Sequence, residues 1–366
     1  MILRLLQSFL IVLLSTSFLV AQLDSNNMSY KRLEGETDSA NLQANIIQQA
    51  EQISGNYEFS IANKETTTID VAGHIDEDNN AVINQLGNNE HVLKGIFLDD
   101  RFTGIWKAGE TEKNIELFES YPDGSIPLYI YYLHSEENLI EDDTKSPSAE
   151  IELTVIYPDN FLYKDSSLIK INNIITSHFI ETEEEFTHPD SLLINVEEDF
   201  YMLYREQNKD WHYSGNSFGW IKETGMSVTY NSNQILCLEY LDYVYTGGAH
   251  GMSKLQYDII DIETGNKISF RNIFNKGSEE RLTEILTQQL RKNKQIPDEL
   301  PLTESGYFVE EIKPGKIIYV NGSGIGFVYN SYEIAPYSTG ITNIFLNYKQ
   351  LDGLLKPNTP VSNLIR

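Results

Sequence analysis

Two runs of alternating apolar and polar residues flank a glycine-rich stretch in the second half of this 366-residue chain. The runs cover residues 235–244 and 253–262, and the stretch between them is Tyr245-Thr-Gly-Gly-Ala-His-Gly251. A period of two places successive side chains on opposite faces of a strand, so the pattern predicts two β-strands joined by a turn or a crossing. Glycine has no Cβ and therefore permits positive φ or a close approach by another group. We expect His250 to reach a partner from this turn.

Short strands also dominate the prediction for residues 30–133, where no long helix is expected. Gly55, Gly95 and Gly104 each stand two residues before an aromatic residue, which suggests neighbouring strands of similar design. The β-forming runs, spaced as in a meander, are residues 53–59, 67–71, 81–83, 92–97 and 102–106. The sequence therefore predicts an all-β meander domain over residues 22–135, built as an up-and-down barrel or a sandwich.

A charged segment that contains serine and proline follows at residues 136–150. Its three clusters are Glu136-Glu137, Glu141-Asp142-Asp143 and Ser146-Pro147-Ser148. Such a segment buries little apolar surface. We interpret it as an acidic linker between two domains.

The rest of the chain combines helices with strands. Apolar residues recur at helical spacing from Leu168 to Phe179, again after Pro189, and again after Ser278, which is expected to cap the third helix. Strands are predicted for residues 151–157, 220–270, 315–329 and 341–346. These patterns predict an α+β module with helices on one face of a mainly antiparallel sheet. We divide the module into domains 151–240 and 241–356, followed by a tail at residues 357–366.

The first 21 residues have the pattern of a secretory signal peptide. A lone Arg4 precedes a short apolar stretch, and a small residue, Ala21, stands before Gln22. The only cysteine, Cys237, lies far downstream, so no lipid attachment at the cleavage point and no intrachain disulfide is expected. We expect an exported protein that is not a lipoprotein, located in the periplasm, on the outer surface or outside the cell.

The chain is strongly acidic, with 27 Lys and Arg residues against 54 Asp and Glu residues and a net charge of −27. Such a charge repels phosphate backbones and anionic lipids, so we expect no nucleic-acid partner and no membrane association after signal cleavage. Cationic proteins, cationic peptides and divalent metals remain suitable partners. Solubility alone is the simpler explanation of the charge.

Several segments resemble one family of extracytoplasmic domains. They are Tyr245 to Gly251, the strand Tyr257 to Ile262 with its Thr264-Gly265 turn, Ile273-Phe274, and Phe327 to Gly340. The family is the RsiV/PdaC-like domain of unknown function, shared by the lysozyme-sensing anti-sigma factor RsiV and by the accessory region of the deacetylase PdaC. The order of the segments resembles a PdaC-like companion domain, residues 151–240, followed by an RsiV-type domain, residues 241–356. This resemblance implies an α+β fold and recognition of a cell-wall component or a wall-attacking protein.

The resemblance does not extend to chemistry. PdaC-type enzymes depend on a separate metal-dependent deacetylase domain, which we do not find in this sequence. RsiV-type regulators carry a cytoplasmic segment before a membrane span, whereas only Met1 to Arg4 precede the apolar run here. Neither deacetylation nor control of a sigma factor is therefore implied.

Our leading interpretation is a non-enzymatic binding or sensing protein that recognises a cell-envelope glycan such as peptidoglycan, or a cationic wall-active protein such as lysozyme. The expected binding residues are Tyr245, Gly247, Gly248, His250, Glu333, Pro336 and Tyr337. One alternative is an envelope polysaccharide-modifying enzyme with His250 and Glu333 as acid and base. Another is a structural envelope protein whose two domains only hold or space others. In a structural interpretation of His250 itself, its ring locks the turn by bonding a backbone carbonyl or a tyrosine hydroxyl.

Our leading interpretation includes no catalytic residue, metal or cofactor. Gly215, Ser217 and Gly219 fit the G-x-S-x-G pattern, but a nucleophile elbow needs a strand before it and a helix after it, and the expected order is the reverse. The seven histidines lack H-E-x-x-H or H-x-H spacing, and one thiol cannot build a zinc site.

Overall fold

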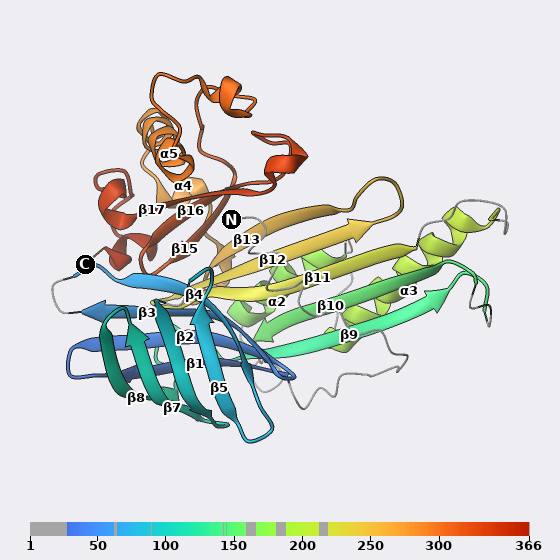
Figure 1. The fold of residues 1–366 in the computed structure, drawn as a ribbon, viewed down its shortest axis with the longest axis horizontal. Coiled ribbons are helices and arrows are strands. Elements are labelled where there is room, and N and C mark those ends of the chain that lie inside the picture. The colour runs from blue at the N-terminus through green and yellow to red at the C-terminus, as the bar shows by residue number, and fades with distance from the viewer. Residues whose placement is uncertain are drawn as a thin grey trace.

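The computed structural model describes residues 28–365, apart from residues 62–63, 89, 142, 144, 159–165, 181–187 and 212–218. The expected signal peptide and Ser217 lie outside the described residues. Figure 1 shows a barrel, a long sheet that extends away from it, and a C-terminal lobe beside both.

The N-terminal part is a closed, eight-stranded antiparallel barrel in which each strand pairs with the next and β1 pairs with β8. Its strands are β1 (Met28–Glu36), β2 (Ala40–Gln49), β3 (Gln52–Ile61), β4 (Thr67–Ile75), β5 (Asn80–Gln85), β6 (His91–Phe97), β7 (Arg101–Ala108) and β8 (Thr111–Glu119). The predicted up-and-down barrel is therefore confirmed, and five of its eight strands match the expected runs. Gly95 and Gly104 are register partners, and a Cβ on either would lie 2.6 Å from the Cα of the other. Close strand contact thus explains these two glycines.

The segment that the sequence suggests as an acidic linker belongs to a hairpin, so that interpretation is wrong. Strands β9 (Leu128–Asn138) and β10 (Ser148–Pro158) pair along their whole length, from Leu128 with Pro158 to Asn138 with Ser148. Alternation explains the error: Ala149 and Ile151 are buried, while Glu150 between them points to the opposite face of the sheet. The chain leaves the barrel at residues 120–127 instead.

A six-stranded sheet in the order β14-β13-β12-β11-β10-β9 forms the second part. All its pairs are antiparallel except β10 with β11. The further elements are β11 (Trp220–Ser232), β12 (Ile235–Tyr245), β13 (Met252–Asp261), β14 (Asn266–Lys267), α2 (Ser166–Phe179) and α3 (Pro189–Asn208). Helices α2 and α3 cover one face of the sheet, behind the strands in Figure 1, where Ile171, Ile175 and Leu192 are fully buried. The opposite face meets β2 and β3 of the barrel near one end, since β11 contacts both strands.

The C-terminal lobe has a sheet of its own, in the order β15-β16-β17. Its elements are α4 (Phe270–Ile273), α5 (Glu279–Lys294), β15 (Ile317–Asn321), β16 (Gly324–Tyr329), β17 (Thr342–Asn347), and the 3₁₀ turns η3 (Leu302–Ser305), η4 (Tyr337–Thr339), η5 (Tyr348–Leu351) and η6 (Val361–Leu364). Helix α5 buries Leu282, Leu286 and Leu290, as its spacing predicts. Ser278 occupies the N-cap position, but its side chain makes no capping hydrogen bond. The predicted α+β class is thus confirmed, with two sheets where the sequence suggested one.

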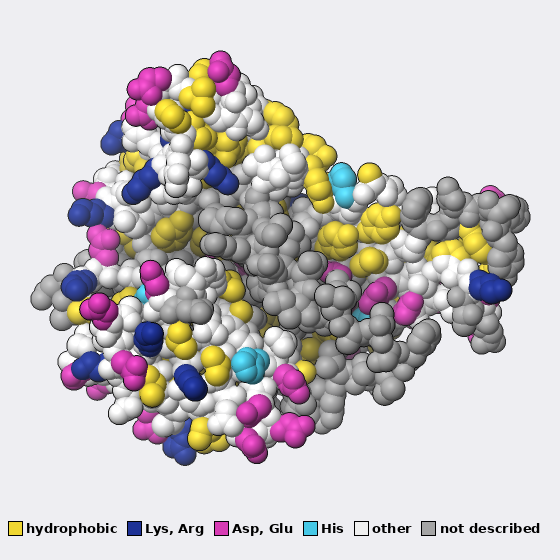
Figure 2. Space-filling model, in the orientation of Figure 1, with side chains coloured by type: hydrophobic (Ala, Val, Ile, Leu, Met, Phe, Trp, Pro, Cys, Tyr) yellow, Lys and Arg dark blue, Asp and Glu magenta, His cyan; other side chains and the backbone are white. Residues whose placement is uncertain are grey.

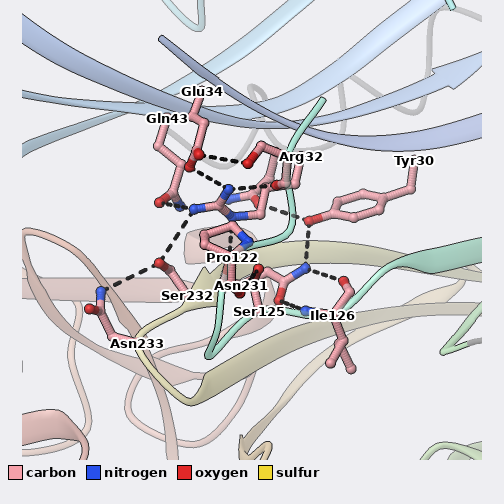
Figure 3. Close-up of polar contacts among 12 residues, drawn as sticks. Tyr30, Arg32, Glu34, Gln43, Pro122, Ser125, Ile126, Asn231, Ser232 and Asn233 are labelled. Carbon is pink, nitrogen blue, oxygen red and sulfur yellow. Dashed lines mark hydrogen bonds and ion pairs between the residues drawn. The ribbon is translucent and has the colours of Figure 1, made fainter. Parts of the chain in front are cut away.

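One buried arginine joins the barrel to the long sheet (Figure 3). The side chain of Arg32 on β1 is 2% exposed. Its guanidinium donates to the carbonyl oxygen of Asn231 on β11 at 2.9 Å and to that of Ser120 at 2.7 Å. It also donates to Glu34 Oε2 and to Gln43 Oε1, both at 2.7 Å. These contacts fix the end of the barrel against the β11–β12 hairpin.

Candidate functional site

The glycine-rich stretch forms the turn between β12 and β13, as the alternating runs predict. Gly247 and Gly248 have φ values of 100° and 102°, which favour glycine. Gly251 serves a different purpose, because a Cβ there would lie 2.5 Å from the ring of Tyr243. The turn therefore depends on glycine both for backbone conformation and for contact with an aromatic ring.

The two motifs that the resemblance singled out meet at this turn. The rings of His250 and Tyr337 stack with centroids 3.8 Å apart and planes 16° apart. The Tyr337 hydroxyl donates to the carbonyl oxygen of Gly251 at 2.9 Å, and His250 Nδ1 lies 3.0 Å from the same oxygen. The exposed His250 ring is thus held by contact with η4, which follows Pro336.

The other predicted residues lie around this stack. The Tyr245 hydroxyl donates to the carbonyl oxygen of Gly248 at 3.1 Å and stiffens the turn. Glu333 is exposed, and in the described part of the chain its carboxylate makes no hydrogen bond or ion pair with His250. Asn330 anchors this segment instead, because its side chain bonds both the N–H and the C=O of Leu255 on β13, at 2.8 and 3.0 Å.

A row of carboxylates continues from the turn across the open face of the sheet. Glu152 on β10 and Glu223 on β11 are register partners, and Glu150 lies two residues from Glu152 on the same face. Glu223 is in turn the register partner of Tyr243, whose ring touches Gly251. We call Glu150, Glu152, Glu223, Tyr243, His250 and Tyr337 the sheet-face site. Figure 2 views this face, with acidic side chains and a histidine beside a group of hydrophobic side chains.

Electrostatic repulsion is built into the carboxylate row. Burial raises the pKa of the Glu223 carboxyl to about 7, and the neighbouring charges of Glu152 and Glu150 add to the rise. Burial also raises the pKa of Glu152. His134 lies beside this row: its Nε2 is 2.9 Å from Glu150 Oε1, and this hydrogen bond lowers the pKa of Glu150 and raises that of His134. His134 is also the register partner of Glu152, and its charge and a hydrogen bond from Tyr132 offset part of the rise in the pKa of Glu152. A cation placed beside Glu152 and Glu223 would relieve this repulsion.

No sequence motif singles out the three carboxylates. A strand pattern was present, since Glu150 and Glu152 alternate with buried Ala149 and Ile151. Ala149 and Glu150, however, lay within the expected linker at residues 136–150, so the alternation was not recognised. Which residue of β11 lies beside Glu152 depends on the parallel register, which no local pattern specifies.

The described residues hold neither a metal-ligand cluster nor a membrane-spanning helix. No group of three or more His, Cys, Asp or Glu side chains among them is arranged to hold a metal ion. Across residues 28–365, with the gaps given above, no helix combines the length and apolar character of a membrane span.

Two family models match parts of the chain. The model described as Deacetylase PdaC matches residues 144–253, and the model described as Protein of unknown function (DUF3298) matches residues 271–349. The PdaC-like resemblance is thus confirmed, while the RsiV-type assignment of the C-terminal region stays a prediction. No curated protein matches the chain significantly.

The solved structures similar to this chain include two from the DUF3298 family. A DUF3298 family member from Bacteroides fragilis NCTC 9343 has a TM-score of 0.59 at 21% sequence identity, over 66% of this chain and 99% of that protein. A DUF3298 family protein from Pseudomonas aeruginosa PAO1 has a TM-score of 0.44 at 18% identity, over 63% of this chain and 96% of that protein. The first likeness shows a related fold, and function has to be argued from the site.

Proposed function

We propose that this chain is an exported, non-enzymatic binding protein that recognises a cationic wall-active protein through the sheet-face site. The observation that carries the proposal is the row of Glu150, Glu152 and Glu223 on an open sheet face, with one histidine as partner. Carboxylates that lie close together repel one another, and carboxyl groups with pKa values raised in this way are typical of functional sites. Lysine and arginine side chains of a partner would offset that cost.

The aromatic end of the sheet-face site supports the same role. Tyr243, His250 and Tyr337 offer rings beside the carboxylates, and exposed Val244 and Met252 flank the turn. Aromatic rings contribute contact area and accept cations on their faces. The net charge of −27 would also speed the approach of a basic protein.

The test is calorimetric binding of hen lysozyme, a basic wall-active protein, to the purified mature chain at low salt. We expect binding that weakens with added salt and falls about tenfold or more in the double variant Glu152→Gln/Glu223→Gln. The matched control is Glu110→Gln/Glu112→Gln, which makes the same charge change at exposed positions on the barrel. Equal losses in both double variants would mean that net charge alone attracts lysozyme, and would refute the proposed site.

A cell-envelope glycan is the second candidate, favoured by the exposed His250–Tyr337 stack. Sugar rings pack on such aromatic surfaces, and peptidoglycan fragments are the probe. His250→Ala separates recognition from structure: loss of glycan binding at an unchanged melting temperature supports recognition. A large fall in melting temperature with binding retained assigns the ring to the turn alone. Absence of binding to both lysozyme and peptidoglycan fragments at low salt removes both partner classes.

A further inference from the structure

A second region with ligand-binding features lies far from the sheet-face site. An open cavity of about 1050 Å³ separates the barrel from the β11–β12 turn and the C-terminal lobe, and it shares no residue with that site. Its wall includes Glu34 from β1, Gln43 from β2, Glu58 from β3 and Tyr348 from η5. Its volume is that of a small-molecule site.

Glu58 is the unusual member of this wall. It is 7% exposed, and its Oε1 accepts hydrogen bonds from the N–H of Gly322 at 2.6 Å and from Thr68 Oγ1 at 3.1 Å. Its Oε2 makes no hydrogen bond with any described residue. This oxygen is not enclosed by the protein, so it can accept a hydrogen bond from a ligand in the cavity.

The backbone of the C-terminal lobe is shaped around this carboxyl. A Cβ at position 322 would lie 2.2 Å from Glu58 Oε2, so Gly322 is needed for the approach. Gln43 also lines the cavity: its Oε1 accepts from Arg32 at 2.7 Å, which fixes the amide orientation, and its Nε2 is enclosed and has no partner among the described residues. The cavity wall thus presents one acceptor, Glu58 Oε2, that the described protein leaves unused.

The charges on the cavity wall favour a positively charged ligand. Six carboxyl side chains and two lysines line the cavity. Burial raises the pKa of Glu58 to about 7, so an adjacent cation would favour its ionised form. Phe59 and Phe118 add apolar surface, which a metal ion would not use.

We propose that this cavity binds a small organic cation, whose ammonium or guanidinium group donates to Glu58 Oε2. The apolar part of the ligand packs against Phe59. The volume admits a molecule the size of an amino sugar or a short polyamine. This inference is independent of the sheet-face site, because no residue is shared.

The experiment measures binding of agmatine, spermidine and glucosamine to the mature chain, by ligand-observed NMR followed by calorimetry at about pH 7. N-acetylglucosamine is the uncharged match for glucosamine. We expect at least one of the three cations to bind, with an affinity that falls about tenfold or more in Glu58→Gln. Glu112→Gln, an exposed change on the barrel outside the cavity, should bind as the wild type does.

Glu58→Gln keeps an oxygen that can accept from the Gly322 N–H, so this variant is expected to fold. Gly322→Ala provides a second perturbation, because its methyl group displaces the carboxyl without removing it. Failure of all three cations to bind the wild type overturns the proposal. Wild-type affinity in a folded Glu58→Gln chain overturns it as well, as does equal binding of N-acetylglucosamine and glucosamine.

Discussion

Replacement of Arg32 by methionine tests whether one side chain couples the barrel to the long sheet. Methionine fills similar space without donors, so the change removes every hydrogen bond shown for the guanidinium in Figure 3. The backbone carbonyls of Ser120 and Asn231 lose a donor, and so does Gln43 Oε1. Glu34 loses its ion pair, although its side chain is 39% exposed and water compensates in part.

The expected cost follows from these losses. A buried acceptor left without its donor costs about 1–3 kcal/mol, and loss of one partner of a buried charge pair costs about 3–5 kcal/mol. Because Glu34 reaches solvent, the total loss should be smaller than the sum of these costs, and we expect the free energy of unfolding to fall by about 3–5 kcal/mol. Lysine keeps the charge but lacks the planar fork, so Arg32→Lys should fall between the wild type and Arg32→Met.

The assay is urea unfolding followed by tryptophan fluorescence. Trp106 is buried in the barrel and Trp220 in the long sheet, so variants that retain one of them and lack Trp211 report the two parts separately. In Arg32→Met the two transitions should move to lower urea and separate. The control is Lys113→Met, which breaks an exposed ion pair with Asp38 and should change stability little. A stability loss in Arg32→Met no larger than in this control would refute the coupling role.

Two further predictions concern the two sites. Gly251→Ala places a methyl group 2.5 Å from the Tyr243 ring and should destabilise the chain by about 1–3 kcal/mol in urea unfolding. This loss of stability should be smaller in a Tyr243→Ala background. An unchanged loss would show that the Tyr243 ring is not what the methyl group meets. Because burial raises the pKa of Glu58 from 4.5 to about 7, the folded chain binds a proton more tightly there than the unfolded chain, and stability falls as the pH rises through this window. The free energy of unfolding of Glu58→Gln, measured relative to that of the wild type, should therefore be about 3 kcal/mol higher above pH 7 than below pH 4.5. A difference between the two proteins that does not change with pH would contradict the burial of this carboxyl.

Local patterns were sufficient for much of the fold. Alternation predicted the strands on both sides of the Tyr245 to Gly251 turn, and glycines at that turn predicted its positive φ values. Helical spacing after Ser278 predicted the buried side of α5. These features are encoded within a few residues, because side-chain period and glycine conformation are properties of short segments.

Alternation was misleading where charge obscured it. In β10 the carboxylates of Glu150 and Glu152 lie on the open face, while Ile151 lies in the core. A strand with one solvated face and a polar linker share the same composition, and only the paired strand β9 distinguishes them.

The sequence by itself determined five of the eight barrel strands, the all-β character of the N-terminal domain, the glycine turn and the acidity of this protein. Only the tertiary structure decided which side chains meet: Tyr337 donates to Gly251 across 86 residues, and Glu58 accepts from Gly322 across 264. Strand register and the packing of one sheet on another are set by contacts between distant segments, whose energies no local pattern contains. Both proposed sites are built from such contacts, so neither could be assembled from the sequence alone.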